Sequence, residues 1–211
     1  MNNQTFPSQG PSQPSAADTD PASPFRYVFS HGFAAVLEQL QSTLLLTTYQ
    51  AGKLMAVRAN AGLVSTLLRT FERPMGLALN GDRLALGTRR AVWFLRNARD
   101  IAPQLVPPNV CDACFVPRYS HVTGDILGHE MNWGHSPSAG GGATPPDAPP
   151  TELWLVNTRF SCLCTLHPDY SFIPRWRPSF VSALAAEDRC HLNGLAMVDG
   201  QPRFVTALGR S

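Results

Sequence analysis

The sequence predicts an all-β fold, and three observations point to it. The chain of 211 residues contains 19 prolines and 16 glycines, which favours frequent turns over long helices. Segments rich in Leu, Val, Thr and aromatic residues follow one another between turn sequences such as Ala61-Gly62 and Asn80-Gly81-Asp82. They predict strands at 42–49, 53–59, 63–70, 75–79, 83–88 and 91–95. The third observation is an internal repeat.

The repeat relates residues 76–88 to residues 194–206. Both copies begin with Gly-Leu-Ala, continue as an apolar strand, turn at Gly and Asp, and end in a second apolar strand. A third, degenerate copy is divided between 128–133 and 152–158. Without the dividing segment the period is about 50 residues, the length of one four-stranded blade of a β-propeller. A closed ring needs at least about four blades. Since we count three to four, we expect an incomplete or C-terminally truncated propeller-like ring.

The chain outside these repeats predicts three further features. Residues 1–24 are mostly Gln, Asn, Ser, Pro and Ala, a composition typical of a disordered tail. The propeller domain would then span 25–211, and residues 31–42 carry apolar side chains at helical spacing, which predicts one short N-terminal helix. Residues 134–151 are rich in Gly, Pro, Ser and Ala and predict an inserted surface loop, so His135 is a poor candidate for a ligand-binding residue.

Composition excludes several classes of function. Charged residues make up 15% of the chain and the net charge of +2 is not clustered, so no basic surface indicates nucleic acid as a partner. The sequence has neither a secretory signal nor an apolar run of about 18 residues, which argues against a membrane and predicts a cytoplasmic protein. Cys111 and Cys114 have C-x-x-C spacing, but Cys162 and Cys164 alternate as buried apolar residues of a strand would, so a zinc knuckle is disfavoured.

Six motifs along the chain carry a resemblance to a known family: Thr47–Lys53, Phe71–Gly76, Val116–Asp125, Val156–Cys162, Trp176–Phe180 and Ala186–Ala196. Together they resemble a bacterial family of conserved hypothetical proteins, sometimes joined to tetratricopeptide repeats. The resemblance covers most of residues 25–211 and implies a propeller-like β domain of uncharacterised function. Members of that family usually continue further, which implies that Ser211 is a premature end.

A second, local resemblance concerns chemistry. Residues 193–196, Asn-Gly-Leu-Ala, are similar to a segment of the six-bladed gluconolactonase and regucalcin-like hydrolases, in which the asparagine helps to hold a divalent cation. Asn-Gly before a strand is also simply a common tight turn. Both interpretations stay open at this point.

The candidate site follows from the repeat. His129 and Asn193 occupy nearly equivalent positions in successive repeats, and equivalent positions converge at the mouth of a propeller channel. We therefore predict a site for a divalent cation such as Ca²⁺, Mg²⁺ or Zn²⁺, because these ions take oxygen and imidazole ligands. Its predicted ligands are Asp125, His129, Glu187 and Asn193.

Other polar residues complete the prediction. His191 and His121 are candidate general bases near neutral pH. Arg118 and Arg189 are candidate contacts for a carboxylate or phosphate of the ligand, because the guanidinium group binds such anions through two hydrogen bonds. In the alternative interpretation Glu187, Asp188 and Arg189 form a structural ion-pair network between blades.

Two functional hypotheses remain. In the first, the propeller binds a small polar ligand, with or without a divalent metal, and acts as a lactonase-like hydrolase, as an isomerase or as a binding protein. In the second, it is a non-catalytic scaffold that presents its rim to a protein partner. No nucleophile elbow, P-loop or dinucleotide fingerprint indicates another class of enzyme.

Overall fold

The computed structural model describes residues 27–30, 32–108, 110–136 and 149–209. The predicted tail at 1–24 lies outside the described residues, as do positions 137–148 of the predicted insertion. The chain divides into two compact units. The first comprises Met1–Leu46 and Met55–Leu68, and the second comprises Thr47–Leu54 and Arg69–Ser211.

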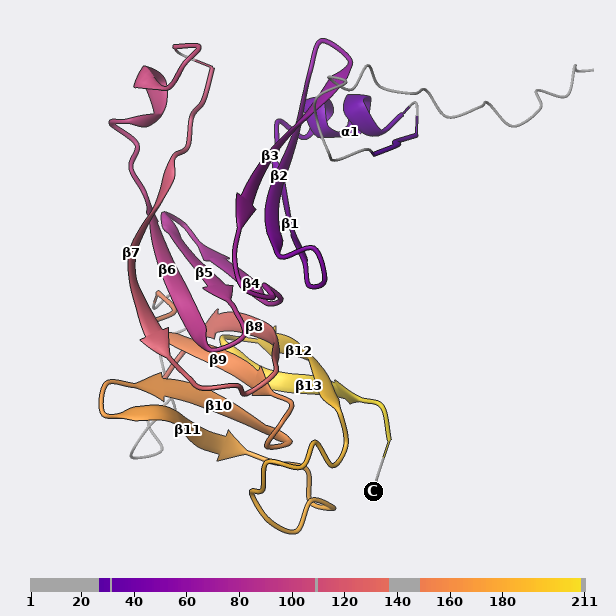
Figure 1. Cartoon of the computed structure of the whole chain (residues 1–211), viewed down its shortest axis with the longest axis vertical. Coiled ribbons are helices and arrows are strands. Elements are labelled where there is room, and N and C mark those ends of the chain that lie inside the picture. The colour runs from indigo at the N-terminus through magenta and orange to yellow at the C-terminus, as the bar shows by residue number, and fades with distance from the viewer. Residues whose placement is uncertain (1–26, 31, 109, 137–148, 210–211) are drawn as a thin grey trace, which may run out of the picture. The chain divides into compact units, whose positions relative to one another are not determined.

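The prediction of an all-β, propeller-like fold is confirmed. The described residues form 13 strands in four sheets, with one short α-helix and one short 3₁₀ helix, η1, at Ala102–Gln104. Each sheet is a meander in which strands adjacent in sequence are adjacent in space (Figure 1). No helix in the described part of the chain is long and apolar enough to cross a membrane.

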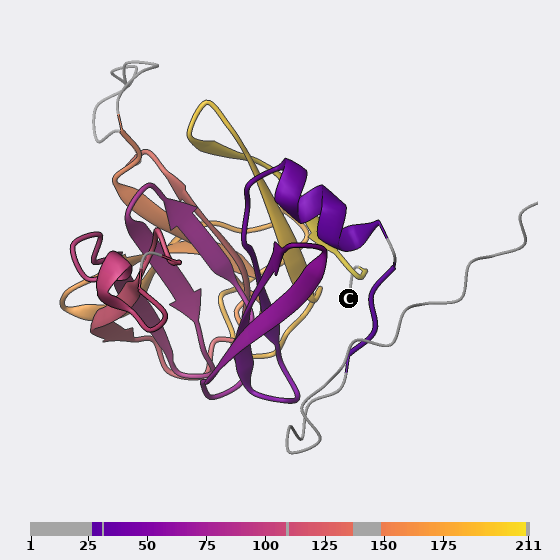
Figure 2. The same ribbon diagram turned by 90° about the horizontal axis from the view of Figure 1, so that it is seen from above.

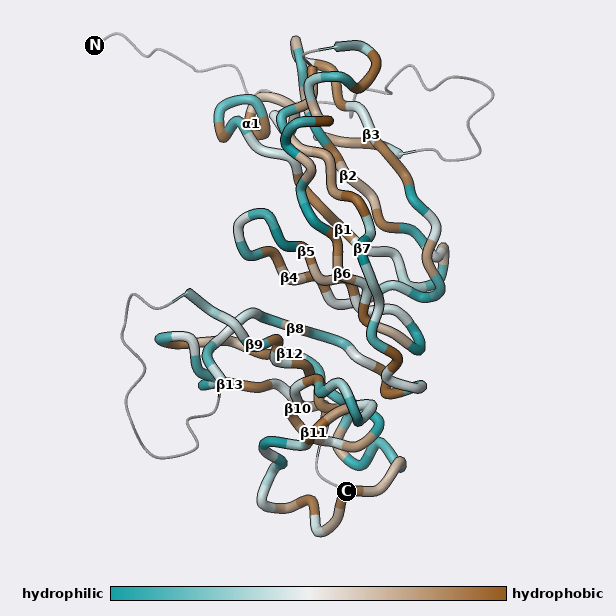
Figure 3. The backbone as a smooth tube through the Cα atoms, turned by 90° about the vertical axis from the view of Figure 1, so that its left-hand side faces the viewer, coloured by the Kyte–Doolittle hydropathy of each residue, from teal (hydrophilic) through white to brown (hydrophobic). Residues whose placement is uncertain are grey.

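The first unit contains the predicted N-terminal helix and most of one sheet (Figure 2). Helix α1 spans Phe33–Gln39 and buries Ala34 and Leu37, which lie three residues apart on one face. The sheet has the order β1-β2-β3, and its strands are β1 (Leu44–Thr48), β2 (Lys53–Asn60) and β3 (Leu63–Thr70). Along β3 hydrophobic and hydrophilic residues succeed one another (Figure 3), and half-buried positions alternate with exposed ones.

The second unit contains the other three sheets. The first has the order β4-β5-β6-β7 and consists of β4 (Leu77–Asn80), β5 (Arg83–Gly87), β6 (Ala91–Asn97) and β7 (Phe115–Val122). The next has the order β11-β10-β9-β8 and consists of β8 (Gly128–Gly134), β9 (Glu152–Asn157), β10 (Cys162–His167) and β11 (Tyr170–Trp176). The last pairs β12 (Leu192–Val198) with β13 (Gln201–Ala207).

The internal repeat corresponds to the first two strands of each of these sheets. Its copies are β4–β5, β8–β9 and β12–β13. Strand β8 contacts both β4 and β12 (Figure 1), so the first strands of the three sheets are neighbours, as they are around a propeller channel. The turn of the last copy is a two-residue hairpin in which Asp199 and Gly200 have φ values of 50° and 70°. Positive φ at both positions is the requirement of a type I′ turn, which explains the Asp-Gly sequence.

The core lies between successive sheets, and β9 is buried on both of its faces. Leu153 and Leu155 face the β4–β7 sheet, whereas Trp154 and Val156 pack with residues of β12 and β13. Side chains of a strand alternate between faces, so burial on both sides requires an unbroken apolar run. This requirement explains the sequence Leu-Trp-Leu-Val.

His135 is buried, although the sequence analysis placed it in an inserted surface loop. Strand β8 continues to Gly134, and His135 is buried, with its backbone N–H donating to Gly200 O at 2.7 Å. The carbonyl oxygen of His135 accepts a hydrogen bond from Trp154 Nε1 at 3.0 Å. The predicted loop at 134–151 therefore begins with two residues that belong to the packed domain.

The thiols of β10 are expected to resist alkylation in the folded protein. Cys162 and Cys164 are buried in the core between the sheets, as their alternation predicted. Burial raises the pKa of Cys162 to about 12 and raises that of Cys164 well above its usual range. At pH 8 both thiols stay protonated, and the thiolate is the nucleophile. Iodoacetamide at pH 8, followed by peptide mass spectrometry, should label the half-exposed Cys111 and Cys114 and spare Cys162 and Cys164 until denaturant is added. Labelling of Cys162 at the rate of Cys111 would contradict the packing described.

Candidate functional site

Four loops of the second unit meet at one end of its sheets. Two of these loops lead into β8 and β12, each of which is the first strand of its sheet. The other two loops connect β5 to β6 and β9 to β10. Backbone hydrogen bonds tie these loops together: Thr123 N donates to Arg90 O at 2.9 Å, Arg159 N to Ile126 O at 3.1 Å, and Asp188 N to Arg159 O at 2.9 Å. The predicted site residues of these loops are therefore brought to the same end of the domain.

Asp125 lies at the centre of a charged network among these loops. Its Oδ2 atom accepts from Arg89 Nε at 3.3 Å and lies 3.4 Å from Arg159 Nη2. Arg89 also lies 3.5 Å from Glu72, and its hydrogen bond to Asp125 raises the pKa of Arg89 above its usual value. The other carboxylate oxygen of Asp125, Oδ1, is buried and has no hydrogen-bond partner among the described residues. Asp125, a predicted metal ligand, is thus already bound by two guanidinium groups.

Sequence analysis missed the two arginines of this network. Arg89 and Arg159 occupy equivalent places, because each follows a threonine directly after the second strand of its sheet. The Thr-Arg pair in two copies of the repeat was the signal that could have found them. Arg89 is therefore not a simply solvated turn residue, because it is paired with both Asp125 and Glu72.

A second cluster consists of Asp188, His191 and His129. The Nδ1 atom of His191 lies 2.8 Å from Asp188 Oδ2, and the rings of His191 and His129 meet edge to face with their centroids 4.9 Å apart. Since a carboxylate can only accept a hydrogen bond, Nδ1 of His191 carries the hydrogen and donates a hydrogen bond to Asp188 Oδ2. The lone pair of neutral His191 is then on Nε2. We name these three residues the histidine cluster.

Burial and neighbouring charges shift the pKa of His129 in the histidine cluster. Burial lowers the pKa of His129, the nearby His191 lowers it further, and Asp188 opposes the shift. His129 is therefore neutral at pH 7 and can donate or accept a hydrogen bond. The side chains of His191 and Asp188 are 38% and 31% exposed, so solvent and solutes can reach them.

The backbone of the cluster is unusual. Asp188 and His191 have φ values of 48° and 46°, and Leu127, two residues before His129, has φ of 51°. Positive φ is uncommon for residues other than glycine, although Asp, Asn and His adopt it more readily than most. Such conformations cost free energy and concentrate at functional sites. The loops that lead to His129 and to His191 thus both contain residues with positive φ.

Glu187 and Arg189 form a separate pair. Arg189 Nε donates to Glu187 Oε2 at 2.8 Å, and Arg189 Nη1 donates to Ser182 Oγ at 2.8 Å. The backbone N–H of Arg189 donates to Ser161 Oγ at 3.0 Å, which ties this segment to the β9–β10 loop. Glu187 and Arg189 thus form an ion pair with each other within one loop, whereas Asp188 is hydrogen-bonded to His191.

The remaining predicted site residues lie elsewhere or make no contact with the histidine cluster that would test their roles. Arg118 and His121 lie on β7, the outermost strand of its sheet, and His121 Nε2 lies 3.0 Å from Ser171 O on β11. Asn193 lies on β12 two residues after His191, and its side chain is exposed. Their roles in ligand or metal binding stay predictions.

Among the described residues, no three or more His, Cys, Asp or Glu side chains are grouped to hold a metal ion. Of the predicted ligands, Asp125 and Glu187 are paired with arginines. His129 has instead a second imidazole beside it, that of His191. The two imidazoles are the residues of the described site that could contact a cation such as Zn²⁺.

Comparison with known protein families shows which family the chain belongs to. A family model described as a domain of unknown function, DUF4915, matches residues 31–211. The chain belongs to this family. The predicted membership of an uncharacterised family is confirmed, whereas the bacterial origin and the association of DUF4915 members with tetratricopeptide repeats stay predictions. No curated protein and no solved structure gave a significant match.

Proposed function

We propose that this DUF4915 domain binds a small polar ligand at the histidine cluster. The observation that carries the proposal is the hydrogen bond between His191 Nδ1 and Asp188 Oδ2 beside the ring of His129. A carboxylate that fixes one nitrogen of an imidazole leaves the other in a defined orientation for a ligand or a proton. The ring of His191, fixed in this way, and the ring of His129, with centroids 4.9 Å apart, suit a ligand with hydroxyl or carbonyl groups.

The same arrangement supports a role for His191 in proton transfer. Its Nε2 lone pair could accept a proton from a bound water or hydroxyl group, and Asp188 would stabilise the imidazolium that forms. Arg159 and Asp125 would contribute by holding the loops in place, since Asp188 N donates to Arg159 O. A divalent cation bound by Nε2 of His191 and by His129 would supply a Lewis acid at the same place. Hydrolysis, isomerisation and simple binding all remain within this proposal.

The experiment measures thermal stabilisation by small molecules. Hydroxy acids, sugars, their lactones and, separately, Co²⁺ are added to the parent protein and to the variants His129→Gln and His191→Asn. Asn is chosen at position 191 because it tolerates positive φ. We expect at least one of these compounds to raise the melting temperature of the parent protein, and both variants to lose most of that increase.

The control is His167→Gln. His167 lies on β10, and its Nδ1 is 3.8 Å from Asp169 Oδ2, so it is another histidine beside an aspartate. The control should keep the full stabilisation. If no compound stabilises the parent protein, or if the stabilisation survives both substitutions in the cluster, the proposal fails and the protein-scaffold hypothesis is favoured.

A further inference from the structure

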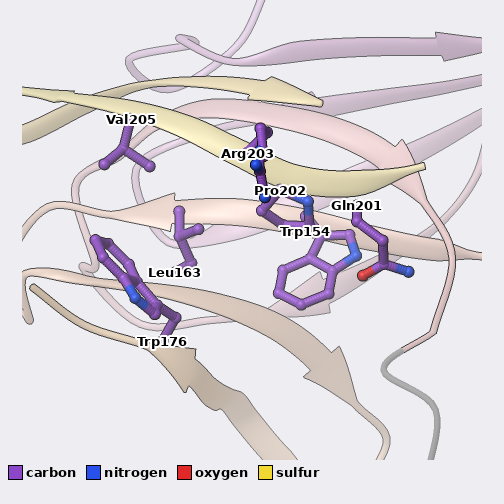
Figure 4. Close-up of a pocket in the computed structure, with 7 residues that line it drawn as sticks. All are labelled: Trp154, Leu163, Trp176, Gln201, Pro202, Arg203 and Val205. Carbon is purple, nitrogen blue, oxygen red and sulfur yellow. The ribbon is translucent and has the colours of Figure 1, made fainter. Parts of the chain in front are cut away.

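A separate pocket lies between the β8–β11 sheet and the β12–β13 hairpin. It has a volume of about 300 Å³. The residues that line it are Trp154, Leu163, Trp176, Gln201, Pro202, Arg203 and Val205 (Figure 4). None of them belongs to the histidine cluster, and the volume is at the lower end of the range for small-molecule sites.

One wall of the pocket is apolar. Trp154 and Leu163 are buried side chains of the central strands β9 and β10. Trp176 ends β11, pairs in register with Leu163 and is 45% exposed. Figure 4 shows Trp154 and Trp176 on either side of Leu163, beneath β13. Because the Nε1 atom of Trp154 already donates to His135 O, this indole has its polar edge satisfied and offers the pocket only its apolar surface.

The opposite wall carries polar groups that are not used within the domain. Gln201 and Arg203 are alternate residues of β13 and project from the same face of the strand. In the part of the chain that the structure describes, the side chains of Gln201 and Arg203 form no hydrogen bond or ion pair, and no acidic residue lines the pocket. An exposed guanidinium beside two indoles is complementary to an anion attached to an apolar body.

We propose that this pocket binds a small aromatic carboxylate. The aromatic ring would pack against the indole of Trp176 and against Leu163, the carboxylate would take two hydrogen bonds from Arg203, and the Gln201 amide would donate to the remaining lone pairs. Charge and shape both contribute, because Arg203 recognises the anion and the apolar wall recognises the ring. This site is independent of the histidine cluster.

The test compares two ligands of nearly the same shape, one anionic and one neutral. Phenylacetate and its neutral isostere phenylacetamide are titrated into the parent protein, and tryptophan fluorescence and calorimetry report binding. We expect saturable binding of phenylacetate that is about tenfold tighter than that of phenylacetamide, since a guanidinium binds a carboxylate through two hydrogen bonds between opposite charges and binds an uncharged amide oxygen more weakly. Arg203→Gln should abolish this preference and leave the affinity for phenylacetamide unchanged.

Two further variants complete the test. Trp176→Ala should weaken both ligands by about tenfold, because it removes the surface on which the ring packs. Arg90→Gln is the matched control, since Arg90 is an exposed arginine in the β5–β6 turn, and it should bind like the parent protein. Circular dichroism verifies that each variant is folded. The proposal is overturned if phenylacetate does not saturate the parent protein, if phenylacetamide binds equally well, or if Arg203→Gln behaves like Arg90→Gln.

Discussion

Leu155→Ala is expected to lower the free energy of unfolding by about 2–5 kcal/mol, the usual loss for truncation of a fully buried leucine. Leu155 is 1% exposed and lies on β9, where it packs with Ala78 of β4, Ala85 of β5 and Met131 of β8. Its side chain thus contributes to the packed interface between the β4–β7 and β8–β11 sheets. Removing three carbons leaves a cavity that strands held by hydrogen bonds on both sides cannot close. Urea denaturation followed by circular dichroism measures the loss.

The control for Leu155 is the same substitution at Leu79. Leu79 belongs to β4 and is 58% exposed, so Leu79→Ala removes the same atoms without leaving a cavity. We expect this variant to change the free energy of unfolding by less than about 1 kcal/mol. Equal losses for the two variants would show that β9 is not packed between sheets, which contradicts a propeller-like arrangement.

Much of this fold could be predicted because its signals are local. The turns need particular residues, and Asp199-Gly200 and Ala61-Gly62 supply the positive φ values that two-residue hairpins require. The alternation of apolar residues indicates which strands are buried on both faces. The internal repeat then gives the order of the sheets, because each copy is one hairpin and successive copies are neighbours. Local sequence does not reveal that His135 is buried, because its partner Gly200 is 65 positions away along the chain.

The candidate site was predicted less completely, for a physical reason. The repeat register placed His129 near the start of an inner strand and the sequence of residues 187–193 drew attention to His191, and the structure brings these two rings together. The path of each loop decides which basic side chain each carboxylate is paired with. Asp188 points to His191 and Asp125 is bound by Arg89 and Arg159, and these pairs are formed only when loops from separate sheets meet.

Asp125→Ala is the second substitution with a large expected effect, a loss of about 1–3 kcal/mol in the free energy of unfolding. It removes the carboxylate from between Arg89 and Arg159, which belong to different sheets, and leaves two half-buried guanidinium groups to repel each other. Asp125→Asn preserves the shape but not the charge and should lose about half as much. Glu72→Ala is the control, because Glu72 is 59% exposed and contacts only Arg89 in this network, and its loss should stay below about 1 kcal/mol.

The same variant separates a structural role of Asp125 from a role in binding. Among the described residues, Asp125 is connected to the histidine cluster through Arg159, whose carbonyl oxygen accepts from Asp188 N. If its role is to position that loop, Asp125→Asn should weaken any ligand of the cluster less than His191→Asn does, and the loss of affinity should accompany the loss of stability. If Asp125 instead contacts the ligand or a cation, Asp125→Asn would abolish binding while the protein remains nearly as stable as the parent. Urea denaturation and a ligand titration on the same samples distinguish the two roles, and the two guanidinium groups on its Oδ2 lead us to expect the first.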